Sequence, residues 1–75
     1  MKKIRFTRYI IVHTIEGYAE FLLDPQRDQV TDLEIQPHEI MEVEYEKDHD
    51  KVIDLRLDSG RIAVGVPKHF FEEVD

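Results

Sequence analysis

Apolar and polar residues alternate most clearly between Glu39 and Pro67, and this alternation predicts three consecutive antiparallel strands over residues 39–46, 52–57 and 61–66. The side chains predicted to face inward are Met41, Val43, Tyr45, Ile53, Leu55, Leu57, Ile62, Val64 and Val66. Those predicted to face outward on the first two strands are Glu42, Glu44, Glu46, Asp54 and Arg56. A shift of one residue in register would turn the inward set to water, so the pattern also specifies the pairing.

Two polar segments predict the turns of this three-stranded unit. Asp58, Ser59 and Gly60 fit a three-residue hairpin turn in which the glycine adopts a positive φ. Residues 47–51 contain only lysine, aspartate and histidine, and they predict a longer hairpin loop. The small residues of the third strand, Ala63 and Gly65, favour a bend or the close approach of another segment.

Residues 3–14 predict one long strand ahead of this unit. The apolar positions of one parity are Ile4, Phe6, Ile10 and Val12, with Arg8 as the exception. Residues 9–12 are apolar on both parities, so this strand needs a cover on each of its faces. We expect the core to cover one face and a second copy of the chain to cover the other.

We therefore predict a homodimer whose interface contains Tyr9, Ile11 and Ile15. Dimerisation would also add buried area that a core of this size lacks. The alternative is that residues 26–37 or the Phe70–Phe71 segment cover the same face within a single chain.

Two segments have an ambiguous pattern. Residues 18–23 fit a strand with Ala19, Phe21 and Leu23 on one side, or a short helix. Asp24 and Pro25 end this segment, because proline lacks the amide that a strand ladder needs. Residues 31–35 fit a short strand or an extended loop on the core.

The end of the chain carries a family resemblance. A strand ends in Gly65, Val66 and Pro67, and the following residues fit one helical turn in which Phe70 or Phe71 plugs the core. This arrangement, closing with residues 72–74, resembles the end of SH3-like barrels. The resemblance implies an all-β fold: a small, antiparallel, five-stranded barrel with a short C-terminal helical turn. Because the chain has no tryptophan, binding of polyproline peptides is not expected.

The length and composition of the chain limit its domain organisation and its cellular location. The 75 residues predict a single small domain over residues 1–75, which buries only about 60% of its unfolded surface. No cysteine is present, which suits a reducing cytoplasm. No apolar run approaches the roughly 20 residues that a membrane helix needs. We therefore expect a cytoplasmic protein.

The charge distribution bears on partners. The formal net charge of −7 combines +4 in the first eight residues with −11 in the rest of the chain. An acidic surface repels phosphate backbones, so direct binding of nucleic acid is not expected. The charge instead favours solubility or a basic protein partner.

We therefore expect a small binding or regulatory module, in which the face formed by Glu42, Glu44 and Glu46 receives a basic surface and Arg56 lies at its edge. The alternative is an acidic mimic of nucleic acid that occupies the groove of a DNA- or RNA-binding protein. Carboxylates at every second residue of a strand are about 6.5–7 Å apart, which is close to phosphate spacing, but this row is short.

Residues that would carry chemistry do not form a recognisable motif. The histidines are His13, His38, His49 and His69, and none has zinc-site spacing. Asp48, Asp50 and Asp54 lack the glycine and terminal glutamate of a calcium loop, and strand parity places Asp54 on the outer face. Ser59 is the only serine, and three glycines form no phosphate loop. We expect no catalysis, no metal site and no cofactor.

Overall fold

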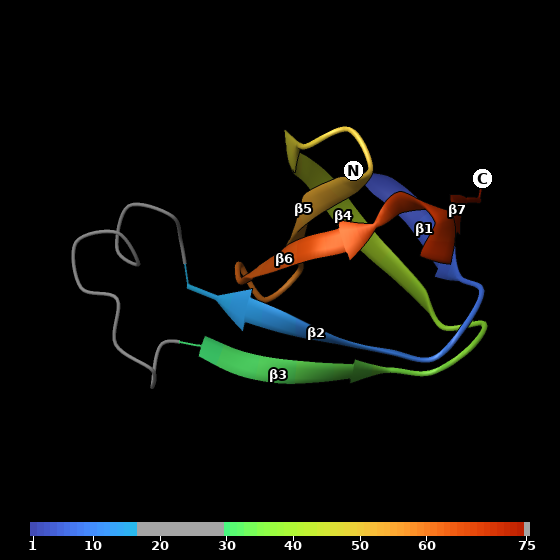
Figure 1. Cartoon of the computed structure of the whole chain (residues 1–75), viewed down its shortest axis with the longest axis horizontal. Helices are drawn as coiled ribbons and strands as arrows, with labels where there is room; N and C mark the ends of the chain where they lie inside the picture. The colour runs from blue at the N-terminus through green and yellow to red at the C-terminus, as the bar shows by residue number, and fades with distance from the viewer. Residues whose placement is uncertain (17–29, 75) are drawn as a thin grey trace.

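The computed structural model describes residues 1–16 and 30–74, and in this part of the chain it is an all-β protein, as predicted (Figure 1). Seven antiparallel strands form one sheet in the order β3-β2-β6-β5-β4-β1-β7. The strands are β1 (Lys2–Phe6), β2 (Ile10–Ile15), β3 (Val30–Ile35), β4 (Ile40–Asp48), β5 (Val52–Leu57), β6 (Ile62–Pro67) and β7 (Phe71–Glu73). No helix in these residues is long and apolar enough to cross a membrane.

The sheet formed by the described residues has seven strands and is open, so the predicted five-stranded SH3-like barrel is not supported. Within these residues β3 pairs only with β2, and β7 pairs only with β1, which leaves the sheet with two ends. Two causes raise the strand count: the predicted first strand is divided, and the end of the chain forms β7. The turn expected at Gly17 and the strand or helix expected at 18–23 lie outside the described residues.

The predicted long strand is divided at residues 7–9 because its two halves have different neighbours. Strand β1 pairs with β4 and β7, whereas β2 pairs with β3 and β6. Between them, the amide of Thr7 donates to the carbonyl of Phe70 at 2.8 Å. The guanidinium of Arg8 lies 4.6 Å from the centre of the Phe70 ring. Arg8 therefore breaks the apolar parity because it belongs to a connection and not to a strand.

The three strands β4, β5 and β6 form and pair as predicted, but Tyr45, predicted to face inward, is exposed, and the register between β4 and β5 shifts directly after it. Arg56 lies opposite Glu44, and Leu55 lies opposite both Tyr45 on β4 and Ala63 on β6. Gly60 has φ +88° in the turn between β5 and β6. The amide of Gly60 donates to the carbonyl of Leu57 at 2.9 Å, which closes this turn.

A β-bulge in β6 overturns the predicted orientation of Val64 and the predicted exposure of Asp54. Ile53 pairs with Val66 and Leu55 pairs with Ala63, so β6 has one more residue than β5 over this interval. The extra residue is accommodated at Gly65, which has φ +67°. As a result Val64, predicted to face inward, is exposed, and Ala63 is buried in its place. Asp54, predicted to face water, is buried.

The main core lies on the concave side of the curved sheet and draws on β1 to β6. Its buried members are Ile4, Phe6, Val12, Ile35, Val43, Ile53, Leu55, Ala63 and Val66. Most of these positions follow the predicted parity. Burying an aliphatic or aromatic side chain of this kind contributes about 1.5–3 kcal/mol, so this cluster dominates the stability of the domain.

The C-terminal aromatics have separate positions. Lys68–Phe70 form a single 3-10 turn, and the chain then returns as β7 beside β1. The ring of Phe71 packs on that of Phe6 with centroids 5.8 Å apart, so Phe71 is the aromatic that reaches the core. Strand β1 near the start of the chain and β7 near its end consequently lie side by side (Figure 1).

Candidate functional site

The acidic row, which we define as Glu42, Glu44 and Glu46, follows β4. Its last member is neutralised: the Nε and Nη2 atoms of Arg56 donate to the two carboxylate oxygens of Glu46 at 2.9 and 2.8 Å. These hydrogen bonds hold the pKa of Glu46 below its usual value and raise the pKa of Arg56. The structure therefore brings all four residues of the predicted partner surface together, but it already uses Glu46 and Arg56 on each other.

Glu42 and Glu44 remain available to a partner. Both are exposed, and within residues 1–16 and 30–74 neither carboxylate lies within 4 Å of a basic side chain. Lys3 lies opposite Glu42 on the neighbouring strand β1. The row is thus flanked by Lys3 on one side and by Arg56 on the other.

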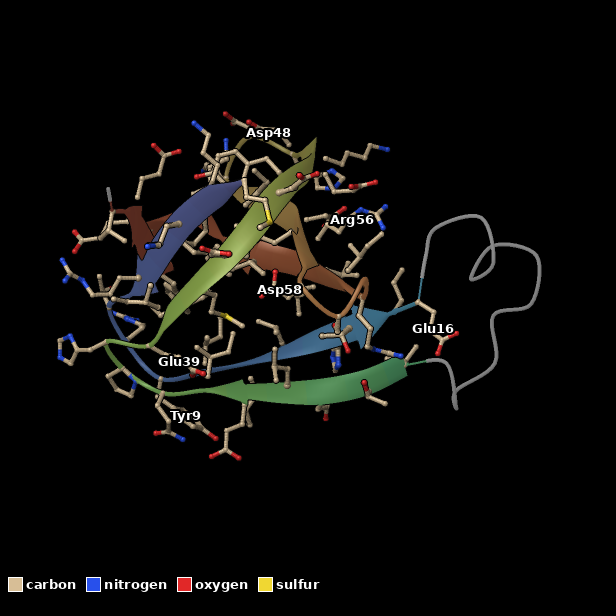
Figure 2. All side chains as sticks on the ribbon, turned by 180° about the vertical axis from the view of Figure 1, so that it is seen from behind. Tyr9, Glu16, Glu39, Asp48, Arg56 and Asp58 are labelled. Atoms are coloured by element: carbon tan, nitrogen blue, oxygen red, sulfur yellow. The ribbon has the colours of Figure 1, made fainter. Side chains whose placement is uncertain are left out.

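A surface groove of about 460 Å³ adjoins the row at the start of β4. We call it the β3–β4 groove, and its lining residues are Leu33, Glu39, Ile40, Met41, Glu42, Leu57, Asp58 and Ser59. Leu33, Met41 and Leu57 also pack against the core, so they form an apolar floor. Figure 2 shows Glu39 beside the start of β4 and Asp58 at the turn that follows β5. Sequence reasoning missed this groove because the lining residues come together only through the order of the strands.

The residues predicted for self-association are divided by the fold. Ile11 is 55% exposed and Tyr9 is also exposed, and Figure 2 shows Tyr9 projecting outward beyond β2 and β3. Ile15 is only 4% exposed within the chain, so it offers little surface to a second copy, and its part in the interface stays a prediction. It lies opposite Ile62, which is buried as well. The exposed Val64, which lies opposite His13 on β2, joins the surface instead. We call Tyr9, Ile11 and Val64 the outer patch.

Asp54 is the buried carboxylate of the described residues, with 1% of its surface exposed. Its Oδ1 atom accepts a hydrogen bond of 2.8 Å from the amide of Gly65, and its Oδ2 atom lies 2.8 Å from Nε2 of His49. The carboxylate therefore fastens the bulge of β6 to the loop between β4 and β5. The signal in the sequence was Gly65 inside a strand, which predicted a bend without identifying its partner.

The three aspartates weighed as calcium ligands do not act together. Asp48 binds Nζ of Lys68 at 2.6 Å, and this hydrogen bond lowers the pKa of Asp48. Asp54 instead faces the bulge at Gly65, and Asp50 is exposed with φ 77°. In the part of the chain that the structure describes, no group of three or more acidic or histidine side chains is arranged to hold a metal ion.

Comparisons with known proteins give no relative: no family model matches the chain, and neither a curated protein nor a solved structure is significantly similar to it. The function is therefore argued from the geometry of the acidic row, the β3–β4 groove and the outer patch.

Proposed function

We propose that this chain is a small protein-binding module whose acidic row receives a basic surface of a protein partner. The observation that carries the proposal is that Glu42 and Glu44 are exposed, make no ion pair with the described residues and adjoin a groove with an apolar floor. A charged rim around an apolar patch is typical of protein interfaces, in which the charges steer the partner and the apolar residues supply affinity.

Mimicry of nucleic acid is the less favoured alternative. A mimic needs an uninterrupted array of carboxylates, whereas Arg56 neutralises Glu46 and Lys3 lies beside Glu42. Binding is also favoured over catalysis, because Glu42 and Glu44 are exposed on an open strand face and do not lie in an enclosed pocket of the kind that acid–base catalysts occupy. We propose a cytoplasmic location, which the lack of cysteine suits. The SH3-like resemblance of residues 65–74 stays a prediction and carries no part of this proposal.

The proposal is tested by capturing proteins from a lysate on the immobilised chain and comparing it with the double variant Glu42→Lys/Glu44→Lys. We expect the captured partner to be lost from this variant, because the charge reversal converts attraction for a basic surface into repulsion. Binding of the wild-type chain should weaken as salt is added, since exposed charges are screened over about 10 Å at 0.1 M ionic strength.

Glu16→Lys/Asp50→Lys is the matched control. It makes the same change in net charge at two exposed positions that lie on neither β3 nor β4 and do not line the groove. A partner that binds both double variants equally at low salt would show that the acidic row only confers solubility.

We further propose that two copies associate through the outer patch. An exposed isoleucine and tyrosine beside an exposed valine form an apolar area that a two-fold arrangement buries on both copies at once. Sedimentation at micromolar concentration should give the mass of a dimer for the wild-type chain and of a monomer for Ile11→Glu. A wild-type monomer at every concentration, or a folded Ile11→Glu dimer, would contradict this interface.

A further inference from the structure

Among the described residues, the β3–β4 groove lies between two stretches of backbone that lack a strand partner on that side. Strand β3 ends the sheet that these residues form and pairs there only with β2. On β4, residues 40–42 pair with β1 but lie beyond the pairing with β5, which starts at Val43 and Leu57. Within the described residues, the groove is therefore bordered by amides and carbonyls that an added strand would satisfy.

The side chains around the groove separate into two layers. Leu33 and Met41 face the core, and Leu57 joins them at the end of β5. Ile40 and Glu42 alternate with Met41 along β4 and so face outward, where the carboxylates of Glu39 and Asp58 also line the groove. No lysine or arginine lines the groove among the residues that the structure describes.

We infer that the β3–β4 groove binds an extended segment of a protein partner in which apolar and basic residues alternate, and that this segment adds as a strand to the free edge of β3. The inference rests on the proposed protein-binding function and specifies the partner's chemistry. Strand addition gives affinity through backbone hydrogen bonds and specificity through alternate side chains. Here the inward side chains would meet the apolar floor, and the outward ones would meet carboxylates.

A second copy of this chain fits the groove less well than a basic partner does. Two copies that paired through β3 would bring Asp32 and Glu34 of each copy close to the same residues of the other. Like charges on an edge strand discourage such pairing. A basic segment meets no such repulsion, and the chain's own basic strand β1 is already paired on both sides by β4 and β7.

The test uses the full ¹⁵N-labelled chain and a capped octapeptide of alternating lysine and valine as the probe. We expect the peptide to shift the amide signals of residues around the groove and to slow hydrogen exchange along β3. An octapeptide of alternating glutamate and valine should not bind. The inference would be overturned if the lysine peptide failed to bind. It would also be overturned if the amide signals along β3 shifted with protein concentration in the absence of peptide, because this would indicate that a second copy of the chain binds there.

Two further peptides, methylated at the backbone nitrogens of all valines or of all lysines, test strand addition itself. Each methylation pattern removes the donors on one edge of the peptide, so at least one of the two should bind about tenfold or more weakly, as the loss of two or three hydrogen bonds implies. Both methylated peptides binding as tightly as the parent would refute strand addition.

The variants Glu42→Lys and Glu44→Lys separate this inference from the proposed function. They make the same charge change on one strand, but only Glu42 lines the groove. We expect Glu42→Lys to weaken peptide binding several-fold more than Glu44→Lys. If both variants weakened peptide binding equally, and the methylated peptides bound as tightly as the parent peptide, the acidic row would remain a binding surface and the groove would be rejected as the binding site.

Discussion

Replacing Asp54 with alanine tests the role of the buried carboxylate at the bulge. The hydrogen bond from the amide of Gly65 is short and has a charged acceptor, so its loss costs about 1.5–3 kcal/mol. The contact with His49 counts for less, about 0.5–1 kcal/mol, because the His49 side chain is 39% exposed and water replaces its partner. Alanine also removes the desolvation cost of the carboxylate, which offsets part of this loss. We expect a net destabilisation of about 2 kcal/mol.

This amount is large for a domain of this length. At 0.05–0.15 kcal/mol per residue, 75 residues give a total stability of about 4–11 kcal/mol. A loss of 1 kcal/mol lowers the melting temperature of such a domain by about 4–8 °C, so Asp54→Ala should melt about 8–16 °C below the wild type. Calorimetry or thermal circular dichroism measures this difference directly.

Asp54→Asn is the matched control, because the amide oxygen of asparagine still accepts from Gly65. We expect it to lie between the wild type and Asp54→Ala, and to keep the Gly65 amide protected from hydrogen exchange. An unchanged melting temperature for Asp54→Ala would refute the reasoning. Equal losses for the two variants would show that the bond to Gly65 is not the stabilising contact.

Two further predictions concern stability. Gly60→Val should lower the free energy of unfolding by about 1–3 kcal/mol in a denaturant titration, because a β-branched residue is strained at φ +88°; an unchanged midpoint would show that the turn adapts. Burial, followed by the hydrogen bond to Glu73, raises the pKa of Tyr45 from its ordinary 10.0 to about 12. The folded chain thus holds this proton more tightly than the unfolded chain does, so the stabilisation is complete below pH 10 and is lost between pH 10 and 12. The ultraviolet phenolate signal should contain a component that titrates near pH 12 and is missing from Tyr45→Phe, and no difference between the two titrations would contradict the assignment.

Local patterns in the sequence predicted the parts of the fold that depend on neighbouring residues. The turn at Gly60 and the pairing of β4 with β5 follow from alternation and turn chemistry, both of which act over a few residues. The orientation of Val64 was wrong, because the bulge at Gly65 adds one residue to β6 and reverses the parity of the residues before it. Asp54 lies on β5, where Ile53 and Leu55 face the core as predicted; its exposure was wrong because its carboxylate is buried against the Gly65 amide and His49. A periodicity of two contains no information on where such an insertion falls.

The candidate site was only partly predictable for a related reason. The acidic row lies within one strand, so its alternation was visible in the sequence. Alternation predicted Arg56 at the edge of the row, but not its hydrogen bonds to Glu46, which depend on how β4 pairs with β5. The β3–β4 groove depends on which strands end the sheet, and that order is set by pairings between distant segments such as Ile4 with Glu73. The burial of Ile15 likewise depends on Ile62, far along the chain.

The order of the strands has a consequence for how the chain folds. Among the described connections, those between β4 and β5 and between β5 and β6 are the short ones that join strands paired with each other, so this unit closes its loops at the smallest entropic cost. Strands β1 and β7 come from opposite ends of the chain and pair only after most of the chain between them has folded. A topology with so many distant pairings folds in milliseconds to seconds, not microseconds. A change in the Gly60 turn should therefore slow folding, whereas a change in β7 should mainly speed unfolding.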